Sequence, residues 1–241
     1  MRRFYASPQQ FRDDGVTLTT EESRHLRNVL RLKAGDLAQI FDGEGREYIG
    51  EVVDARAPES HLRIVREVEP TAPESQLDLR LVTAVYKNDK LDLVVQKAVE
   101  LGVVRLSPIV TLRSETNLRD SAKRIDRWRK IALEATKQCE RAVLMEVDDP
   151  LNLSDLIERV DTPSSELFIF SERSGEGMPA SVRHKKTTAL IGPKGGWEDS
   201  EIELARESGF VPVKLGRRIM RAETAAIAFA AVMQHRFGDL N

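Results

Sequence analysis

The sequence lacks several features that would narrow its class at once. It has a single cysteine, Cys139, among 241 residues. This excludes an internal disulfide and a cysteine-rich zinc site, and the four histidines show no metal-ligand spacing, so we expect no metal. No apolar run approaches the roughly 20 residues of a membrane helix, and the first 15 residues lack the apolar stretch of a signal peptide. We therefore expect a soluble, cytoplasmic protein without a membrane partner.

An excess of positive charge is also missing. Lys and Arg number 37 against 39 Asp and Glu, which gives a net charge of −2. The overall charge therefore does not indicate a nucleic-acid partner, and any basic surface must be local. The hydrophobic fraction of 41% is that of an ordinary globular protein, and 241 residues are enough for two domains.

The chain changes texture at residues 67–78, EVEPTAPESQLD, which have the prolines and small polar residues of a linker. Before them lie short strand-like runs with a turn signal at Asp42, Gly43 and Gly45. After them, short apolar strands alternate with helices, which indicates a mostly parallel sheet covered on both faces. We predict a small β-barrel domain over residues 1–72 and an α/β domain over 73–241. The predicted strands are 37–42, 46–54, 61–68, 79–86, 104–110, 143–147, 166–170, 187–191 and 211–215.

Four helices are predicted in the second domain. Residues 90–101 have apolar residues at helical spacing and end at Gly102. Residues 120–140 place Ile125, Trp128, Ala132, Ala135 and Cys139 on one face, and we expect Trp128 and Cys139 in the core. Residues 198–209 form a third helix. Residues 223–237 are apolar nearly all round, so this helix is buried in the core or against a second subunit. We predict a homodimer.

Unusual residues follow three of these strands. They are Phe170 to Arg173, Gly192 to Gly196, and Leu215 to Arg218. Ligands of open α/β sheets bind beyond the carboxyl ends of the strands, and the glycines of GPKGG let the backbone approach a ligand closely. A tight surface turn is the alternative. The segment is not a phosphate-binding loop, because GxxxxGK[ST] and GxGxxG are both absent.

Arg221 and Glu223 precede the apolar C-terminal helix. A buried pair of charges at this place is costly unless it is paired or used in the chemistry. The alternative is an ion pair at the start of the helix, with Thr224 or Glu223 as the cap.

These segments resemble a known family. IGPKGGWEDSE followed by VKLGRRIMRAETA resembles the paired C-terminal motifs of the RsmE family, bacterial ribosomal RNA uridine-N3 methyltransferases of the SPOUT superfamily. RHLRNVLRLKAGD, QKAVELGV and RWRKIALEATKQCERA resemble its other segments in the same order. Three residues depart from the family's pattern: Lys194 stands where Glu is usual, Trp197 where Phe is usual, and Met220 replaces a common Leu.

The resemblance implies an architecture and a reaction. The fold would be a SPOUT-type parallel sheet with a C-terminal trefoil knot, preceded by a PUA-like RNA-binding β-barrel. Two subunits would complete a site that binds S-adenosylmethionine and methylates uridine N3 in 16S ribosomal RNA, either free or in the small ribosomal subunit. The implied cofactor-binding residues are Phe170, Ser171, Ile191, Gly192, Pro193, Gly195, Gly196, Leu215, Gly216, Ile219 and Met220.

The reaction assigns roles to Arg221 and Glu223. Attack by uracil N3 on a methyl group requires loss of the N3 proton, so Arg221 would stabilise the negative charge that develops on the neighbouring carbonyl oxygens. Glu223 would orient Arg221 or take the proton, and we favour the orienting role.

A basic stripe indicates the RNA-binding surface. Thr19 to Glu22 fit a capping box that opens a short helix. On this helix Arg24, Arg27 and Arg31 would share one face, with Leu26, Val29 and Leu30 turned inward. The stripe predicts phosphate contacts, and its alternative is an ordinary solvated face.

Two other functions are compatible with the sequence. In the first, the chain would be a SPOUT methyltransferase that acts on another RNA, such as transfer RNA. In the second, it would be a non-catalytic RNA-binding or ribosome assembly factor. In the second case Lys194, which reverses the usual charge beside the cofactor, would be the sign of lost cofactor affinity.

Overall fold

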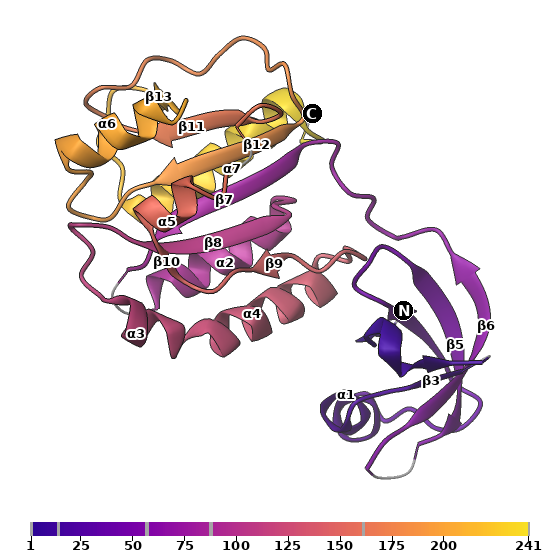
Figure 1. Ribbon diagram of the computed structural model, residues 1–241. Helices are drawn as coiled ribbons and strands as arrows, with labels where there is room; N and C mark the ends of the chain where they lie inside the picture. Colours follow the sequence, from indigo (N-terminus) through magenta and orange to yellow (C-terminus); the bar gives the residue numbers. More distant parts are fainter. Residues whose placement is uncertain (1, 14, 56–57, 87–88, 161, 241) are drawn as a thin grey trace. The chain divides into compact units, whose positions relative to one another are not determined.

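The computed structural model describes residues 2–13, 15–55, 58–86, 89–160 and 162–240. It divides into two compact units, one of Met1–Glu74 with Thr136–Leu144 and one of Ser75–Ala135 with Met145–Asn241 (Figure 1). The predicted division into a domain of residues 1–72 and a domain of residues 73–241, each folding independently, stays a prediction. Their sequence pattern gave no sign that residues 136–144 belong with the N-terminal unit.

The N-terminal unit is built on a six-stranded sheet of order β1-β4-β5-β6-β3-β2. The three predicted strands of this unit are confirmed, and the short strands β1, β2 and β3 were missed because they have only two or three residues each. The turn after β4 is also confirmed, because the Asp42 carboxylate accepts from the backbone of Glu44 at 2.7 Å and of Arg46 at 3.0 Å. The strands are β1 Arg3–Tyr5, β2 Phe11–Arg12, β3 Gly15–Thr17, β4 Leu37–Phe41, β5 Glu47–Asp54 and β6 His61–Val68.

Residues 136–144 are held in this unit by charged groups. The Lys137 ammonium bonds to the Glu22 carboxylate at 2.7 Å. Arg3, paired with the fully buried Glu47 at 2.6 Å, donates to the carbonyl of Arg141 at 2.7 Å. Buried charges are tolerated only when they are paired in this way.

The second unit contains a seven-stranded parallel sheet, which confirms the predicted fold class. Its order is β10-β8-β7-β12-β11-β13, with β9 beside β8. Only Glu146–Val147 of the predicted strand 143–147 is a strand. The predicted trefoil knot stays a prediction. The strands are β7 Asp78–Ala84, β8 Arg105–Val110, β9 Glu146–Val147, β10 Leu151–Asn152, β11 Glu166–Phe170, β12 Lys186–Ile191 and β13 Val211–Val213.

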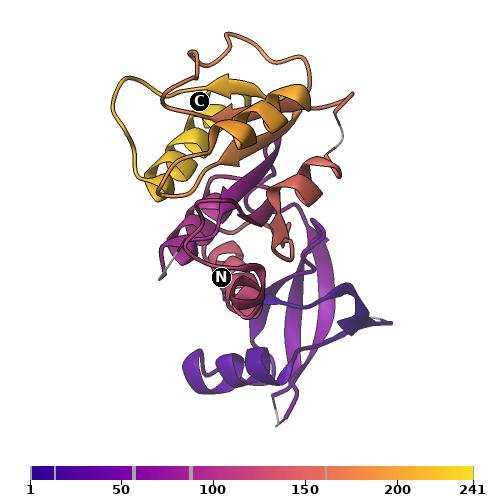
Figure 2. The ribbon, with the colours of Figure 1, turned by 60° about the vertical axis from the view of Figure 1, so that its left-hand side comes forward.

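Helices cover both faces of this sheet (Figures 1 and 2). One face packs against α5 (Leu153–Ile157) and α6 (Asp199–Glu207) around Ile169, Leu190 and Trp197. The other face of the sheet packs against α2 (Lys90–Glu100) and α7 (Ala222–Phe237). On this face the ring centroids of Phe168 and Phe229 lie 6.2 Å apart. The predicted helices 90–101, 198–209 and 223–237 are thereby confirmed.

The predicted helix 120–140 is two helices, α3 (Leu118–Ala122) and α4 (Ile125–Gln138). Trp128 is fully buried as expected, and its indole Nε1 donates to the Asp92 carboxylate at 3.1 Å. Cys139 lies after the end of α4 and is half-buried, so its placement in the core was wrong.

Candidate functional site

The marked strand ends come together at one edge of the parallel sheet. Strands β12, β11 and β13 are neighbours, with Phe170 paired to Ile191 and to Val213. Because the strands are parallel, Ser171, Gly192 and the segment after Val213 leave the sheet at the same side. This edge is where open α/β sheets bind ligands.

The loop after β12 is fastened to the end of β11 by Trp197. The indole is buried, and its Nε1 donates to the carbonyl of Phe170 at 2.9 Å. A Cβ on Gly192 would lie 2.9 Å from this indole, so the ring leaves no room for a side chain there. Gly192 is therefore required for packing, whatever its part in binding.

The rest of this loop is a tight turn supported from β8. The Gly196 amide donates to the Pro193 carbonyl at 2.9 Å, and Gly196 has φ +75°. Arg113, from the segment after β8, donates to the Gly195 carbonyl at 3.0 Å and pairs with Glu198 at 2.6 Å. The hydrogen bond from Arg113 lowers the pKa of the Glu198 carboxyl. The glycine loop is thus held at both ends, and Lys194 in its middle is exposed.

The segments after β11 and β13 are bound to each other. The Ser171 amide donates to the Val213 carbonyl at 2.9 Å, and the Lys214 amide donates to the Glu176 carbonyl at 2.7 Å. The Ser171 hydroxyl is buried and lies 2.7 Å from that of Ser174. These bonds fix the backbone at the edge.

Residues 215–220 offer an open, partly apolar surface. Gly216 has φ +72°, and no atom lies within 4 Å of the place where its Cβ would be. The side chain of Ile219 is 85% exposed. The Met220 amide donates to the Glu172 carboxylate at 2.8 Å, which anchors the end of the segment beside β11. A ligand that covers so exposed an isoleucine removes apolar surface from water, which favours binding.

The expected buried pair of Arg221 and Glu223 is corrected by the structure. Arg221 is exposed and precedes α7, where its side chain makes no capping bond. Glu223 pairs instead with Lys90, whose Nζ lies 2.7 Å from Oε1. Burial alone would raise the pKa of Glu223, but the hydrogen bond from Lys90 and the charges of Lys90 and Arg221 lower it overall. At neutral pH Glu223 is therefore a carboxylate.

Sequence reasoning missed three residues at this edge: Tyr86, Lys90 and Arg113. Each follows the end of a strand in the sheet, so the rule that ligands bind at carboxyl ends would have indicated them. No glycine pattern marks Tyr86, Lys90 or Arg113, and this is why they were passed over.

The arginine stripe of the N-terminal unit differs from the predicted helix. The Thr19 hydroxyl accepts from the Glu22 amide at 3.2 Å, which confirms the cap of α1 (Thr20–Arg24). His25–Val29 then form a π-helical turn, in which the Leu30 amide donates to the His25 carbonyl. The extra residue of this turn rotates the positions after it. Val29, expected inside, is 67% exposed, whereas Leu26 is buried as predicted and Leu30 packs against the core in part.

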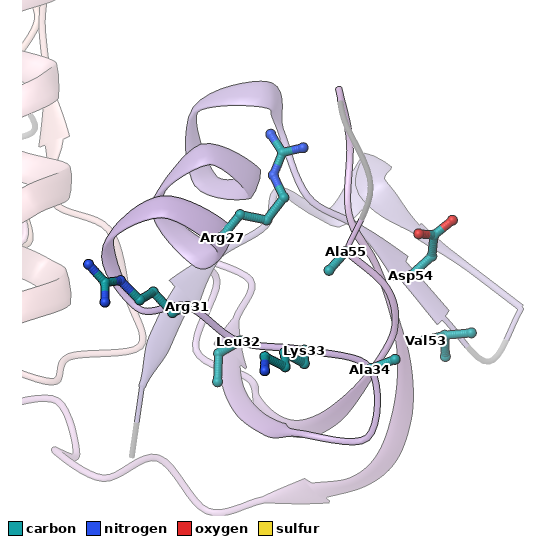
Figure 3. A pocket seen from close by; sticks show the side chains of 8 residues that line it. All are labelled: Arg27, Arg31, Leu32, Lys33, Ala34, Val53, Asp54 and Ala55. Carbon is teal, nitrogen blue, oxygen red and sulfur yellow. The ribbon is translucent and has the colours of Figure 1, made fainter.

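This turn borders a hollow of about 490 Å³. Figure 3 shows Arg27, Arg31 and Lys33 on one side of it and residues of the end of β5 on the other. Arg31 ends the turn with φ +54°. Within the described part of the chain, none of the three cations forms an ion pair, and Arg24 does not line the hollow. The lining residues are Arg27, Arg31, Leu32, Lys33, Ala34, Val53, Asp54 and Ala55.

The described residues lack two further features. They contain no cluster of three or more His, Cys, Asp or Glu side chains able to hold a metal ion. None of their helices has the length and apolar character needed to cross a membrane.

Comparison with known proteins gives matches over nearly the whole chain. Residues 73–234 match an RNA methyltransferase domain, and residues 18–65 match an RNA methyltransferase PUA domain. The chain is 34% identical to the ribosomal RNA small subunit methyltransferase E of Synechocystis, over 95% of this chain and 76% of that protein. It is 30% identical to the protein of that name from Aquifex aeolicus, over 98% and 100%.

Solved structures agree with these matches. The crystal structure of a ribosomal RNA small subunit methyltransferase E from Neisseria gonorrhoeae bound to S-adenosyl methionine has 30% sequence identity, covers 100% of both chains and has a TM-score of 0.90. A putative methyltransferase from Legionella pneumophila, solved with bound SAM, has 28% identity, covers 98% of both chains and has a TM-score of 0.87.

Proposed function

This chain belongs to the ribosomal RNA small subunit methyltransferase E family, and on this premise we propose that it transfers a methyl group from S-adenosylmethionine to N3 of a uridine in 16S ribosomal RNA. The observation that carries the proposal is the edge where β12, β11 and β13 end, with fixed glycine backbone beside exposed Ile219. A ribosomal RNA substrate implies a cytoplasmic location.

The residues of this edge suit S-adenosylmethionine. Space lies open beside Gly196 and Gly216, whose positive φ angles favour glycine. Exposed backbone groups can read the edges of an adenine, and Ile219 and Leu215 can cover its face. When bound, this cofactor supplies an electrophilic methyl group. The residues proposed to hold it are Phe170, Ser171, Ile191, Gly192, Pro193, Gly195, Gly196, Leu215, Gly216, Ile219 and Met220.

Arg221 and Glu223 are the proposed catalytic residues. The guanidinium of Arg221 is exposed and makes no side-chain hydrogen bond with the described residues, so its N–H groups can donate to the uracil carbonyl oxygens. These oxygens become more negative as N3 loses its proton and gains the methyl group. Glu223, with its lowered pKa, is a weak proton acceptor. This supports the orienting role for Glu223, with the N3 proton passing to water.

The hollow of the N-terminal unit is the proposed RNA contact. Arg27, Arg31 and Lys33 present three cations there against one carboxylate, that of Asp54. RNA affinity comes mainly from such contacts to phosphates, and the match of residues 18–65 to an RNA methyltransferase PUA domain supports the same role. Arg24 would extend the contact along α1.

The enzyme is proposed to be a homodimer. On α7, Ile227, Ala228, Ala231 and Val232 are only half-buried, and their spacing places them along one side of the helix. An apolar stripe of this kind suits a symmetric contact with a second copy. Sedimentation at micromolar concentration should give a dimer, and an active monomer would contradict the proposal.

The function is tested by methylation of defined RNAs. Purified protein and S-adenosylmethionine are incubated with unmodified 16S RNA, with small subunits from a deletion strain, and with unmodified transfer RNA. Mass spectrometry of the nucleosides should find 3-methyluridine in the ribosomal samples alone. Methylation of transfer RNA alone would indicate a different RNA substrate. Absence of S-adenosylmethionine binding by calorimetry would indicate a non-catalytic factor.

A further inference from the structure

Lys90 joins two helices at the edge of the sheet that carries the proposed site. It is the first residue of α2, and Glu223 lies in the first turn of α7. The Nζ–Oε1 distance is 2.7 Å, and the side chains are 39% and 16% exposed. The two helices pack together, so the ion pair fastens their first turns to each other.

Among the described residues, the side chains of Tyr86 and of β12 near this ion pair are uncharged. Tyr86, after β7, is buried, and its hydroxyl lies 2.5 Å from that of Thr83. Burial and then the charge of Glu223 raise the pKa of Tyr86, so the tyrosine stays neutral. Strand β12, which also packs against α7, has only uncharged side chains at residues 187–191. Among the described residues, the charged groups that lower the pKa of Glu223 are Lys90 and Arg221.

The position of Glu223 connects Lys90 to the proposed chemistry. Arg221 immediately precedes α7, its carbonyl accepts from the Ala225 amide at 2.8 Å, and Glu223 is two residues further on. A bond that holds Glu223 against α2 therefore also holds the backbone of the first turn of α7. The Lys90 ammonium, from the first residue of α2, is the group that forms this bond.

We propose that Lys90 is a positioning residue for methyl transfer: its ammonium group holds the Glu223 carboxylate and thereby the first turn of α7, which presents Arg221 to the substrate. Lys90 acts through Glu223 and does not itself need to touch uracil or cofactor. The proposal rests on the proposed function, because the role of Arg221 is given there.

The test replaces Lys90 by methionine, which keeps most of the side chain and removes the charge, and by arginine, which keeps the charge. Lys97→Met is the matched control, since Lys97 pairs with Glu100 at 2.7 Å on the same helix with similar exposure. Single-turnover methylation of 16S RNA is followed against pH, together with S-adenosylmethionine affinity and the thermal midpoint.

Lys90→Met should slow the single turnover by roughly 10- to 100-fold at neutral pH, because a misplacement of about 1 Å can cost 100-fold. Cofactor affinity should stay within about twofold of wild type if the defect is confined to positioning. The acid limb of the pH profile should move to higher pH, because Glu223 then keeps its burial and loses the partner that lowers its pKa. Lys90→Arg should keep most of the wild-type rate. Lys97→Met should change neither the single-turnover rate nor the acid limb of the pH profile.

A readout without turnover separates this proposal from the proposed function. Carboxyl carbon NMR should show Glu223 titrating at higher pH in Lys90→Met than in wild type. If wild type fails to methylate RNA while this shift is present, the proposed function alone fails. An unmoved Glu223 titration, or a Lys90→Met rate equal to wild type, overturns the role of Lys90. The role of Lys90 is also overturned if the loss of rate is accompanied by a matching fall in the thermal midpoint and the Lys90→Arg variant is as slow as Lys90→Met.

Discussion

The indole Nε1 of Trp197 donates a hydrogen bond of 2.9 Å to the carbonyl oxygen of Phe170, so the loop after β12 is bound to the last residue of β11. Phenylalanine, which the family resemblance leads us to expect at position 197, has no such donor. The departure from the family's pattern therefore adds a bond between two of the segments proposed to hold the cofactor.

Trp197→Phe should lower stability by about 1–3 kcal/mol, because a buried carbonyl loses its partner. S-adenosylmethionine affinity should fall as well, since the two segments are no longer joined. Trp128→Phe is the control: Trp128 is also buried and also donates its indole N–H, to Asp92. It should lower the denaturation midpoint and leave the affinity unchanged. An equal effect of both variants on affinity would mean that the Trp197 bond has no special part in binding.

Gly216→Val should remove S-adenosylmethionine binding. Gly216 has φ +72° and open space where a Cβ would be, so the added side chain would occupy that space. The backbone strain should cost about 1–2 kcal/mol. Gly35→Val is matched for strain, because Gly35 has φ +91° and open space in the N-terminal unit. Calorimetry should find binding intact in Gly35→Val. Normal binding in folded Gly216→Val would contradict the proposed pocket.

Replacing Arg27 and Arg31 together by alanine should weaken RNA binding and flatten its salt dependence. Each lost phosphate contact should lower the slope of log affinity against log salt by roughly 0.7–0.9. Arg24→Ala is the comparison, because Arg24 is exposed on α1 and does not line the hollow. A slope that stays at the wild-type value in the double variant would identify Arg27 and Arg31 as part of a solvated face.

Periodicity and strand ends predicted much of the fold and the place of the candidate site. The helix of residues 90–101 was found because Leu91, Val94 and Ala98 face the core. The glycine loop was found because GPKGG follows an apolar strand. Both signals are local, and the parallel sheet then brings the separate strand ends together without further information.

Contacts between distant residues could not be predicted in this way. Lys90 and Glu223 are 133 positions apart, and neither has a neighbour that indicates the other. The assumption that Glu223 pairs with Arg221 favoured the nearest cation in sequence. At Val29 the error was local: helical spacing assumes 3.6 residues per turn, and a π-helical turn changes that phase.

The catalytic assignment is tested by Arg221→Ala. The variant should bind S-adenosylmethionine and RNA nearly normally, because Arg221 is exposed and makes no side-chain cap that α7 would lose. It should methylate about 100- to 1,000-fold more slowly, the usual loss when one donor to a developing negative charge is removed. Arg218→Ala, which removes another exposed arginine of the same segment, is the control and should keep most of the rate.

The pH dependence of Arg221→Ala identifies the step that is affected. Raising the pH should partly restore the rate, because hydroxide then supplies the uridine anion that the enzyme no longer favours. Arg221→Lys should recover little if two donors from a planar group are needed, and more if charge alone suffices. Single-turnover rates against pH for wild type and both variants measure this. A wild-type rate in Arg221→Ala, or a defect confined to cofactor affinity, would make Arg221 a binding or structural residue, and the uracil charge would then have to be stabilised by another group at this edge.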